Sequence, residues 1–131
     1  MQPYLLTFSY FLASVAIVFI GLVLFELVTT KYRDWEEIDR GNSAVALSIG
    51  GKIIGVSIVI AFSIYHNDTL PQTLIWGAYG IVLQLVGYYV FDFLTRRFSV
   101  EQRLKENNLA VGIVSFCVSV GLGLVIGSSI T

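Results

Sequence analysis

Residues 109–130 read LAVGIVSFCVSVGLGLVIGSSI, an apolar run without a single charged side chain. A helix needs about 20 predominantly apolar residues to cross the hydrocarbon core of a bilayer, so this run is long enough to span a membrane. Inside a bilayer only helices and closed barrels satisfy their own backbone hydrogen bonds. Because the run is continuous rather than alternating, we expect a helix.

Three further runs have the same character and cover 4–28, 44–65 and 74–94. Their charges are few: Glu26 near the end of the first run, Lys52 near the middle of the second, and Asp92 near the end of the third. The chain is 56% hydrophobic and 13% charged, against about 25% charged in soluble domains. We predict an all-α membrane protein with four transmembrane helices in one domain, 1–131. The first run follows no basic segment and is expected to be a retained span.

The basic residues outside the spans all lie in two connections, 29–41 and 95–107. They are Lys31, Arg33, Arg40, Arg96, Arg97, Arg103 and Lys105. The positive-inside rule places both connections in the cytoplasm, so both termini and the turn at His66 are expected outside. Sequences resembling capping boxes, 34–37 and 99–102, suggest a short interfacial helix in each connection. Two solvated loops are the alternative.

The sequence also repeats itself at an offset of 66 residues, without gaps. The matching pairs include Gly21 and Gly87, Glu26 and Asp92, Asn42 and Asn108, Gly55 and Gly121, Val59 and Val125, and Ser63 and Ser129. We infer an internal duplication, with repeat 1 at about 4–65 and repeat 2 at about 73–131. Each repeat is a helical hairpin, and both insert in the same direction, so a pseudo-twofold axis along the membrane normal is expected.

Small residues recur at helical spacing in the second arm of each hairpin. Gly51 and Gly55 form one GxxxG pattern, Gly123 and Gly127 another, and Gly121 lies nearby. Ser115 and Ser119 extend the second ridge every four residues. Such ridges let helix backbones approach closely in lipid. The partner is either a helix of the same chain or a second copy in a homo-oligomer.

Five polar residues are candidates for function: Glu26, Asn42, Lys52, Asp92 and Asn108. Each carboxylate precedes its N-capping asparagine by 16 residues. The pairs could tie each hairpin closed, form a cation or proton site, or dock a partner. Lys52 is costly so deep in a membrane, and could meet Glu26, line a polar cavity or reach toward the interface.

Several activities find no support in the sequence. We find no pattern for catalysis, for a cofactor or for a metal. The net charge of -1 gives no basic excess for nucleic acid. Gln84 is expected to join helices, His66 to be an exposed turn residue, and Cys117, the only cysteine, to be a small buried residue.

The repeated turn entry suggests a family. Gly-Asn-Ser-Ala-Val-Ala at 41–46, echoed by Asn-Asn-Leu-Ala-Val-Gly at 107–112 and each preceded by an acid, resembles the YjfL-like family of bacterial inner-membrane proteins, domain of unknown function 350. The resemblance covers essentially the whole chain and implies a duplicated four-span protein without catalytic residues to carry over. Members are thought to occur with envelope-stress and peptide-ligase-like proteins, which implies a partner role. Only Glu26, Asp92, Asn42 and Asn108 match recurrent positions of the family.

Two functions remain open at this point. The first is a non-enzymatic, homo-oligomerising scaffold of the bacterial inner membrane that serves envelope maintenance. It would bind membrane lipids, and a cytoplasmic or membrane protein through 29–41 and 95–107. The second is a small ion or solute channel or transporter, with Lys52, Glu26 and Asp92 along a polar path.

Overall fold

The computed structural model describes residues 2–28, 34–94 and 100–130. These residues form α1 (Pro3–Val28), α2 (Asp34–Asp39), α3 (Ser43–His66), α4 (Leu70–Leu94), α5 (Val100–Lys105) and α6 (Leu109–Ser129), and the described part contains no strand. Four of the helices, α1, α3, α4 and α6, are long and apolar enough to cross a membrane. The predicted all-α fold with four spans is confirmed.

One predicted boundary was late by four residues. α4 begins at Leu70 rather than at 74, and Pro71 lies in its first turn, where a proline costs no helical hydrogen bond. The backbone carbonyl of Thr69 accepts from Thr73 N at 3.0 Å, which starts the helix just after the short turn.

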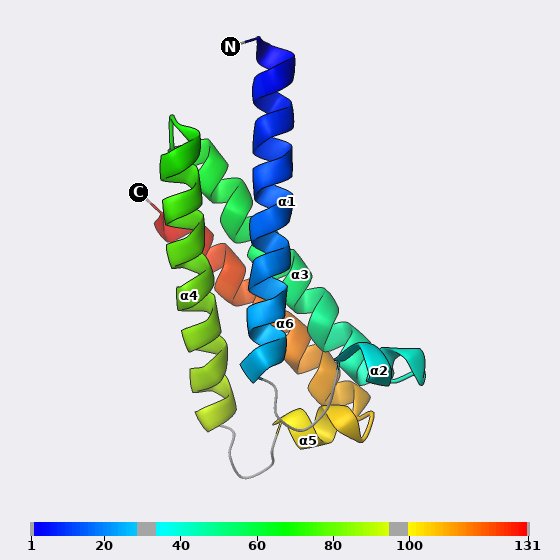
Figure 1. Ribbon diagram of the computed structural model, residues 1–131. Coiled ribbons are helices and arrows are strands. Elements are labelled where there is room, and N and C mark those ends of the chain that lie inside the picture. Colours follow the sequence, from blue (N-terminus) through cyan, green and yellow to red (C-terminus); the bar gives the residue numbers. More distant parts are fainter. Residues whose placement is uncertain (1, 29–33, 95–99, 131) are drawn as a thin grey trace.

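α3 and α6 run parallel and in close contact through the centre of the molecule (Figure 1). Small residues allow this approach: a Cβ atom added to Gly51 would lie 2.7 Å from Phe116 Cα, and one added to Gly123 would lie 2.7 Å from Gly55 Cα. Gly127 is likewise packed, against Phe62. These glycines therefore serve packing within one chain, which was one of the two predicted uses.

Gly121 differs from the other four predicted packing glycines. A Cβ atom there would meet nothing within 4 Å, whereas its repeat counterpart Gly55 is buried against α6. Gly121 is two residues from Gly123, which places it about 200° around the helix from the contact face. The two hairpins thus meet through different faces, so the predicted pseudo-twofold arrangement is wrong at this contact.

α4 packs on both α3 and α6, whereas α1 packs on α3 and α4 and is largely uncovered (Figure 1). α4 also approaches α3 through glycines, since a Cβ atom added to Gly77 would lie 2.7 Å from Ile60 Cδ1 and one added to Gly80 would meet Val59 Cγ1, but these contacts are to side chains rather than to backbone. α1 and α4 run opposite to the central pair (Figure 1), as expected of two hairpins inserted the same way.

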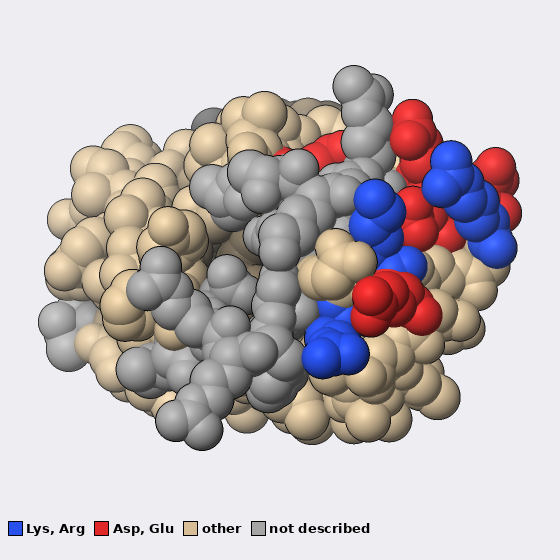
Figure 2. Space-filling view, turned by 90° about the horizontal axis from the view of Figure 1, so that it is seen from below, with Lys and Arg blue, Asp and Glu red and all other residues tan. Residues whose placement is uncertain are grey.

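The short helices α2 and α5 confirm the expectation of helical segments in the charged connections. Their bounds differ by 66 residues, as do the N-caps Asn42 and Asn108. Leu104 of α5 is 1% exposed and packs with Ala44, Val45 and Ile49. Charged side chains gather at this end of the molecule (Figure 2).

Candidate functional site

Lys52 lies inside the bundle, nine residues or about 14 Å along α3 from Ser43. It is 2% exposed. Its Nζ lies 4.7 Å from the ring centroid of Tyr88 in α4 and 5.3 Å from that of Phe25 in α1. A desolvated cation over an aromatic face gains about 2 kcal/mol, while a lysine at the bilayer centre costs at least about 2.5 kcal/mol. The two rings therefore offset much of the cost of this charge.

The structure does not bring Lys52 and Glu26 together as an ion pair in the described part of the chain. Glu26 is half-buried and lines a small cavity of about 50 Å³ with Trp35 and Ile49. Asp92 lies in the last turn of α4, and its side chain is outside the described residues. Lys52 is not among the residues that line this cavity or the groove between α1 and α3, and its ammonium group packs against the Phe25 and Tyr88 rings.

Hydroxyl groups form a chain beside the Tyr88 ring. Ser48 Oγ lies 2.9 Å from Ser115 Oγ, and Ser115 Oγ lies 2.6 Å from the Tyr88 hydroxyl, and in both bonds either oxygen could donate. Ser48 is one turn before Lys52 on the same face of α3. The chain therefore joins α3, α6 and α4 next to the buried ammonium group.

Two buried polar atoms nearby have no partner among the described residues. The Gln84 side chain donates from Nε2 to the Ser119 carbonyl at 3.2 Å, while Gln84 Oε1 and Ser119 Oγ make no hydrogen bond. Both side chains are 0% exposed. Orphaned buried polar atoms are costly unless water or a ligand satisfies them. We refer to Ser48, Lys52, Gln84, Tyr88, Ser115 and Ser119 as the Lys52 cluster.

Buried apolar groups flank the Lys52 cluster along α3. Toward the charged end lies the group that contains Val45, Ile49 and Leu104, and toward the other end lies the group of Phe25, Val56, Ile60 and Ile81. The cluster is thus a largely buried polar site flanked by apolar side chains.

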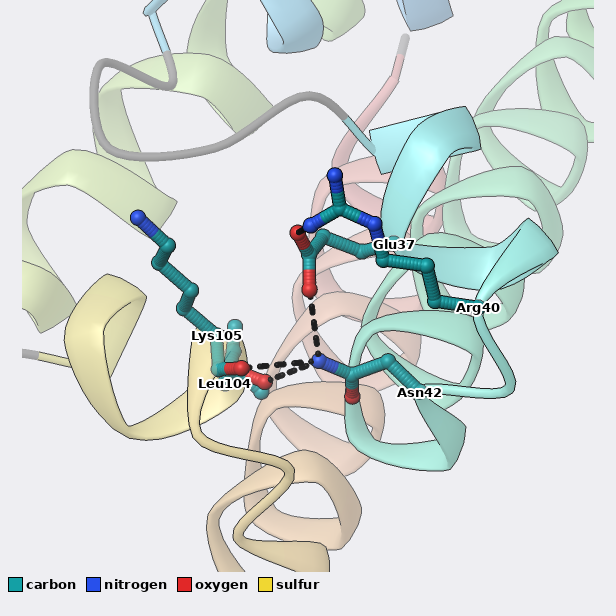
Figure 3. A network of polar contacts seen from close by, with 5 residues as sticks. All are labelled: Glu37, Arg40, Asn42, Leu104 and Lys105. Atoms are coloured by element: carbon teal, nitrogen blue, oxygen red, sulfur yellow. Dashed lines mark hydrogen bonds and ion pairs between the residues drawn. The ribbon is translucent and has the colours of Figure 1, made fainter.

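Asn42 lies apart from this cluster and does not bond to Glu26. Its Oδ1 accepts from Val45 N at 3.0 Å, which caps α3. Its Nδ2 donates to the carbonyls of Leu104 and Lys105 at 2.8 and 3.1 Å, and to Glu37 Oε1 at 3.3 Å (Figure 3). Asn42 therefore fastens one hairpin to the other rather than closing its own.

Among the described residues, the side chain of Asn108, the repeat counterpart, makes one hydrogen bond, accepting from Val111 N at 3.3 Å, which caps its own helix. The neighbouring Asn107 makes the return contact instead, its Oδ1 accepting from Ala44 N at 3.0 Å. Gly41 and Asn107 both have positive φ, 85° and 60°, which glycine and asparagine tolerate best. Asn42 and Asn107 thus act at the junction of the hairpins.

Sequence reasoning missed Ser48 and Tyr88 as site residues. The sequence does contain a pattern that could have identified them, because the polar residues of each helix are four positions apart and share one helix face. The pairs are Ser48 and Lys52, Gln84 and Tyr88, and Ser115 and Ser119. Cys117, expected to be buried, is exposed on α6. No group of three His, Cys, Asp or Glu side chains in the described residues could hold a metal ion.

Comparison with known proteins identifies relatives of this chain and its family. It is 44% identical over 122 residues to the transmembrane protein YshE of Bacillus subtilis, covering 93% of this chain and 90% of YshE. It is 31% identical over 83 residues to the inner membrane protein YjfL of Escherichia coli strain K12, covering 63% and 62% of the two chains. These names describe membrane proteins and give no enzymatic activity. No solved structure matches the chain. Since the family model described as Domain of Unknown Function (DUF350) matches residues 1–130, the chain belongs to this family.

Proposed function

We propose that this multi-pass membrane protein moves protons across the membrane by way of the Lys52 cluster. The observation that carries the proposal is the environment of Lys52, an ionisable side chain 2% exposed in the middle of a membrane helix, with no ion pair in the described residues. Charged residues inside membrane spans are functional candidates because they are expensive to keep. A lysine changes its charge only by gaining or losing a proton.

The hydroxyl chain suits this role. Because either oxygen can donate in both of its hydrogen bonds, the chain of Ser48, Ser115 and Tyr88 can reverse its direction as a proton passes. Gln84 Oε1 and Ser119 Oγ have no hydrogen-bond partner in the described part of the chain. Buried polar atoms of this kind are the ones that bound water satisfies. The apolar layers on either side imply a gated path rather than an open pore.

The test is proton flux into liposomes that contain the purified protein and a pH-sensitive dye, driven by a potassium gradient with valinomycin. The wild-type protein is expected to acidify the lumen faster than empty liposomes, and Lys52→Met to lose this activity. Lys105→Met is the matched control, because Lys105 is exposed on α5. Flux that is equal in Lys52→Met and the wild type, or absent from both, overturns the proposal.

A second candidate is a scaffold of the bacterial inner membrane that serves envelope maintenance and conducts nothing. The dry packing of Lys52 between two rings favours it, because the lysine would then only hold α1 and α4 against α3. The charged ends of α2 and α5 (Figure 2) would contact a cytoplasmic or membrane partner. If the protein is a scaffold, no variant should conduct protons. The protein should then bind its partner only when the connections that contain α2 and α5 are intact.

A further inference from the structure

The groove between α4 and α6 is filled by α3 of the same chain. Gly123 of α6 lies against the backbone of Gly55, and Gly127 against the Phe62 ring. On the α4 side, Gly80 and Gln84 lie against Val59 and Gly55. The second hairpin thus presents a groove, and the first hairpin inserts a helix into it.

In the described part of the chain, no helix inserts into the equivalent groove of the first hairpin, between α1 and α3. It encloses about 380 Å³, and its lining includes Ser14, Val18, Ser57 and Ala61. An offset of 66 residues converts these four into Gly80, Gln84, Gly123 and Gly127. These four counterparts are residues of α4 and α6 that contact α3. Ser14 Oγ is buried here and has no partner in the described part of the chain.

The helix face that matches this groove lies on α6, and it is also uncovered. The inserted face of α3 carries Gly55 and Val59, and the same offset gives Gly121 and Val125. Gly121 has open space beside it, and Val125 is 65% exposed whereas Val59 is 0% exposed. Both residue types are identical in the two repeats. The groove between α1 and α3 thus occupies the position equivalent to the filled one, although its four residues differ in type from their counterparts, and the uncovered face of α6 carries the same two residue types as the inserted face of α3.

We propose that α6 of a second copy occupies the groove between α1 and α3, repeating between chains the contact that α3 makes within one chain. α3 and α6 run parallel (Figure 1), so both copies would insert in the same direction. A contact of two different surfaces is head-to-tail, and it produces a closed ring when the rotation closes. The inference rests on the sequence repeat and the packing, and is independent of proton movement.

The test is disulfide formation between two differently tagged chains expressed together, with Cys117→Ser in both. One chain carries Ser57→Cys and the other Gly121→Cys, because their repeat counterparts Gly123 and Gly55 are in contact. Mild oxidation of membranes should give the mixed dimer several-fold more than the control pair, Ala78→Cys with Gly121→Cys. Ala78 is exposed on α4, away from the groove.

Other occupants give other results. A lipid chain in the groove gives no mixed disulfide above the control, and a symmetric α6 contact gives a disulfide with Gly121→Cys alone; either overturns the proposal. A second measurement is the mass of the detergent-solubilised protein by light scattering. Ala61→Trp, which fills the groove, should convert the oligomer to a folded monomer, while Ala78→Trp should leave it intact. A wild-type monomer in mild detergent and in lipid nanodiscs contradicts the inference.

Discussion

At the scale of single residues, Lys52 and Asn42 show how the chain keeps polar groups in an apolar interior. Lys52 is held by rings from two other helices, and Asn42 satisfies backbone carbonyls of the opposite hairpin. The sequence predicts that Lys52 needs compensation, because the cost follows from its depth alone. It does not predict the compensating groups, because aromatic rings are abundant in every span and their positions depend on how the helices rotate. The same applies to Asn42, whose capping role is local but whose other partners are 62 and 63 residues away.

Removing the Tyr88 hydroxyl should separate the hydroxyl chain from the aromatic contact. Tyr88→Phe keeps the ring over Lys52 but loses the bond to Ser115, so the free energy of unfolding should fall by about 1 kcal/mol. Tyr89→Phe is the control, since Tyr89 is 65% exposed, and should change it little. Unfolding in mixed detergent micelles, followed by circular dichroism, measures both. Equal values for the two variants would contradict the role given to this bond.

The two capping asparagines should differ in their contribution to stability. Asn108→Ala removes a helix cap and should cost about 1 kcal/mol. Asn42→Ala removes a cap and the hydrogen bonds to α5 and Glu37, so about 2–3 kcal/mol is expected. The same unfolding titration compares them. If Asn108→Ala proves the more harmful change, Asn42 does not fasten the hairpins together.

At the scale of helices, the four spans follow from apolar length, and their ends from local chemistry. Runs of this length have no other stable form in lipid, so the spans were predictable. The faces through which the helices meet were only partly predictable. The ridge of Ser115, Ser119, Gly123 and Gly127 is buried, as its spacing suggests, but Gly121 is not. A sequence repeat implies equivalent helices, yet it does not say whether they meet through the same face.

Gly51 and Gly50 provide a matched pair for the contact of α3 with α6. A Cβ atom at Gly51 would meet the Phe116 backbone, whereas one at Gly50 would meet nothing within 4 Å. Gly51→Ala should therefore lower the free energy of unfolding by about 1–3 kcal/mol, and Gly50→Ala should leave it unchanged or raise it by up to about 1 kcal/mol. Detergent unfolding of each variant measures the difference. Two tolerated substitutions would mean that α3 and α6 pack less closely than described.

At the scale of the whole molecule, the charged end that contains α2 and α5 is the basis for predicting the orientation in the membrane. Arg103 and Lys105 lie in α5, Arg40 directly follows α2, and the turn after His66 lies at the opposite end of α3. Basic residues near span ends are retained in the cytoplasm. We therefore expect α2 and α5 to face the cytoplasm, and both termini and the 67–69 turn to face outward.

Single cysteines in a Cys117→Ser background test this orientation. Glu36→Cys and Glu106→Cys place exposed thiols on the two charged segments, and Asp68→Cys places one in the short turn. A membrane-impermeant maleimide added to intact spheroplasts should label only Asp68→Cys, and should label all three after the membrane is opened. Labelling of Glu36→Cys and Glu106→Cys from opposite sides would be incompatible with two hairpins inserted the same way. Labelling of both from outside would keep the fold but invert its orientation in the membrane.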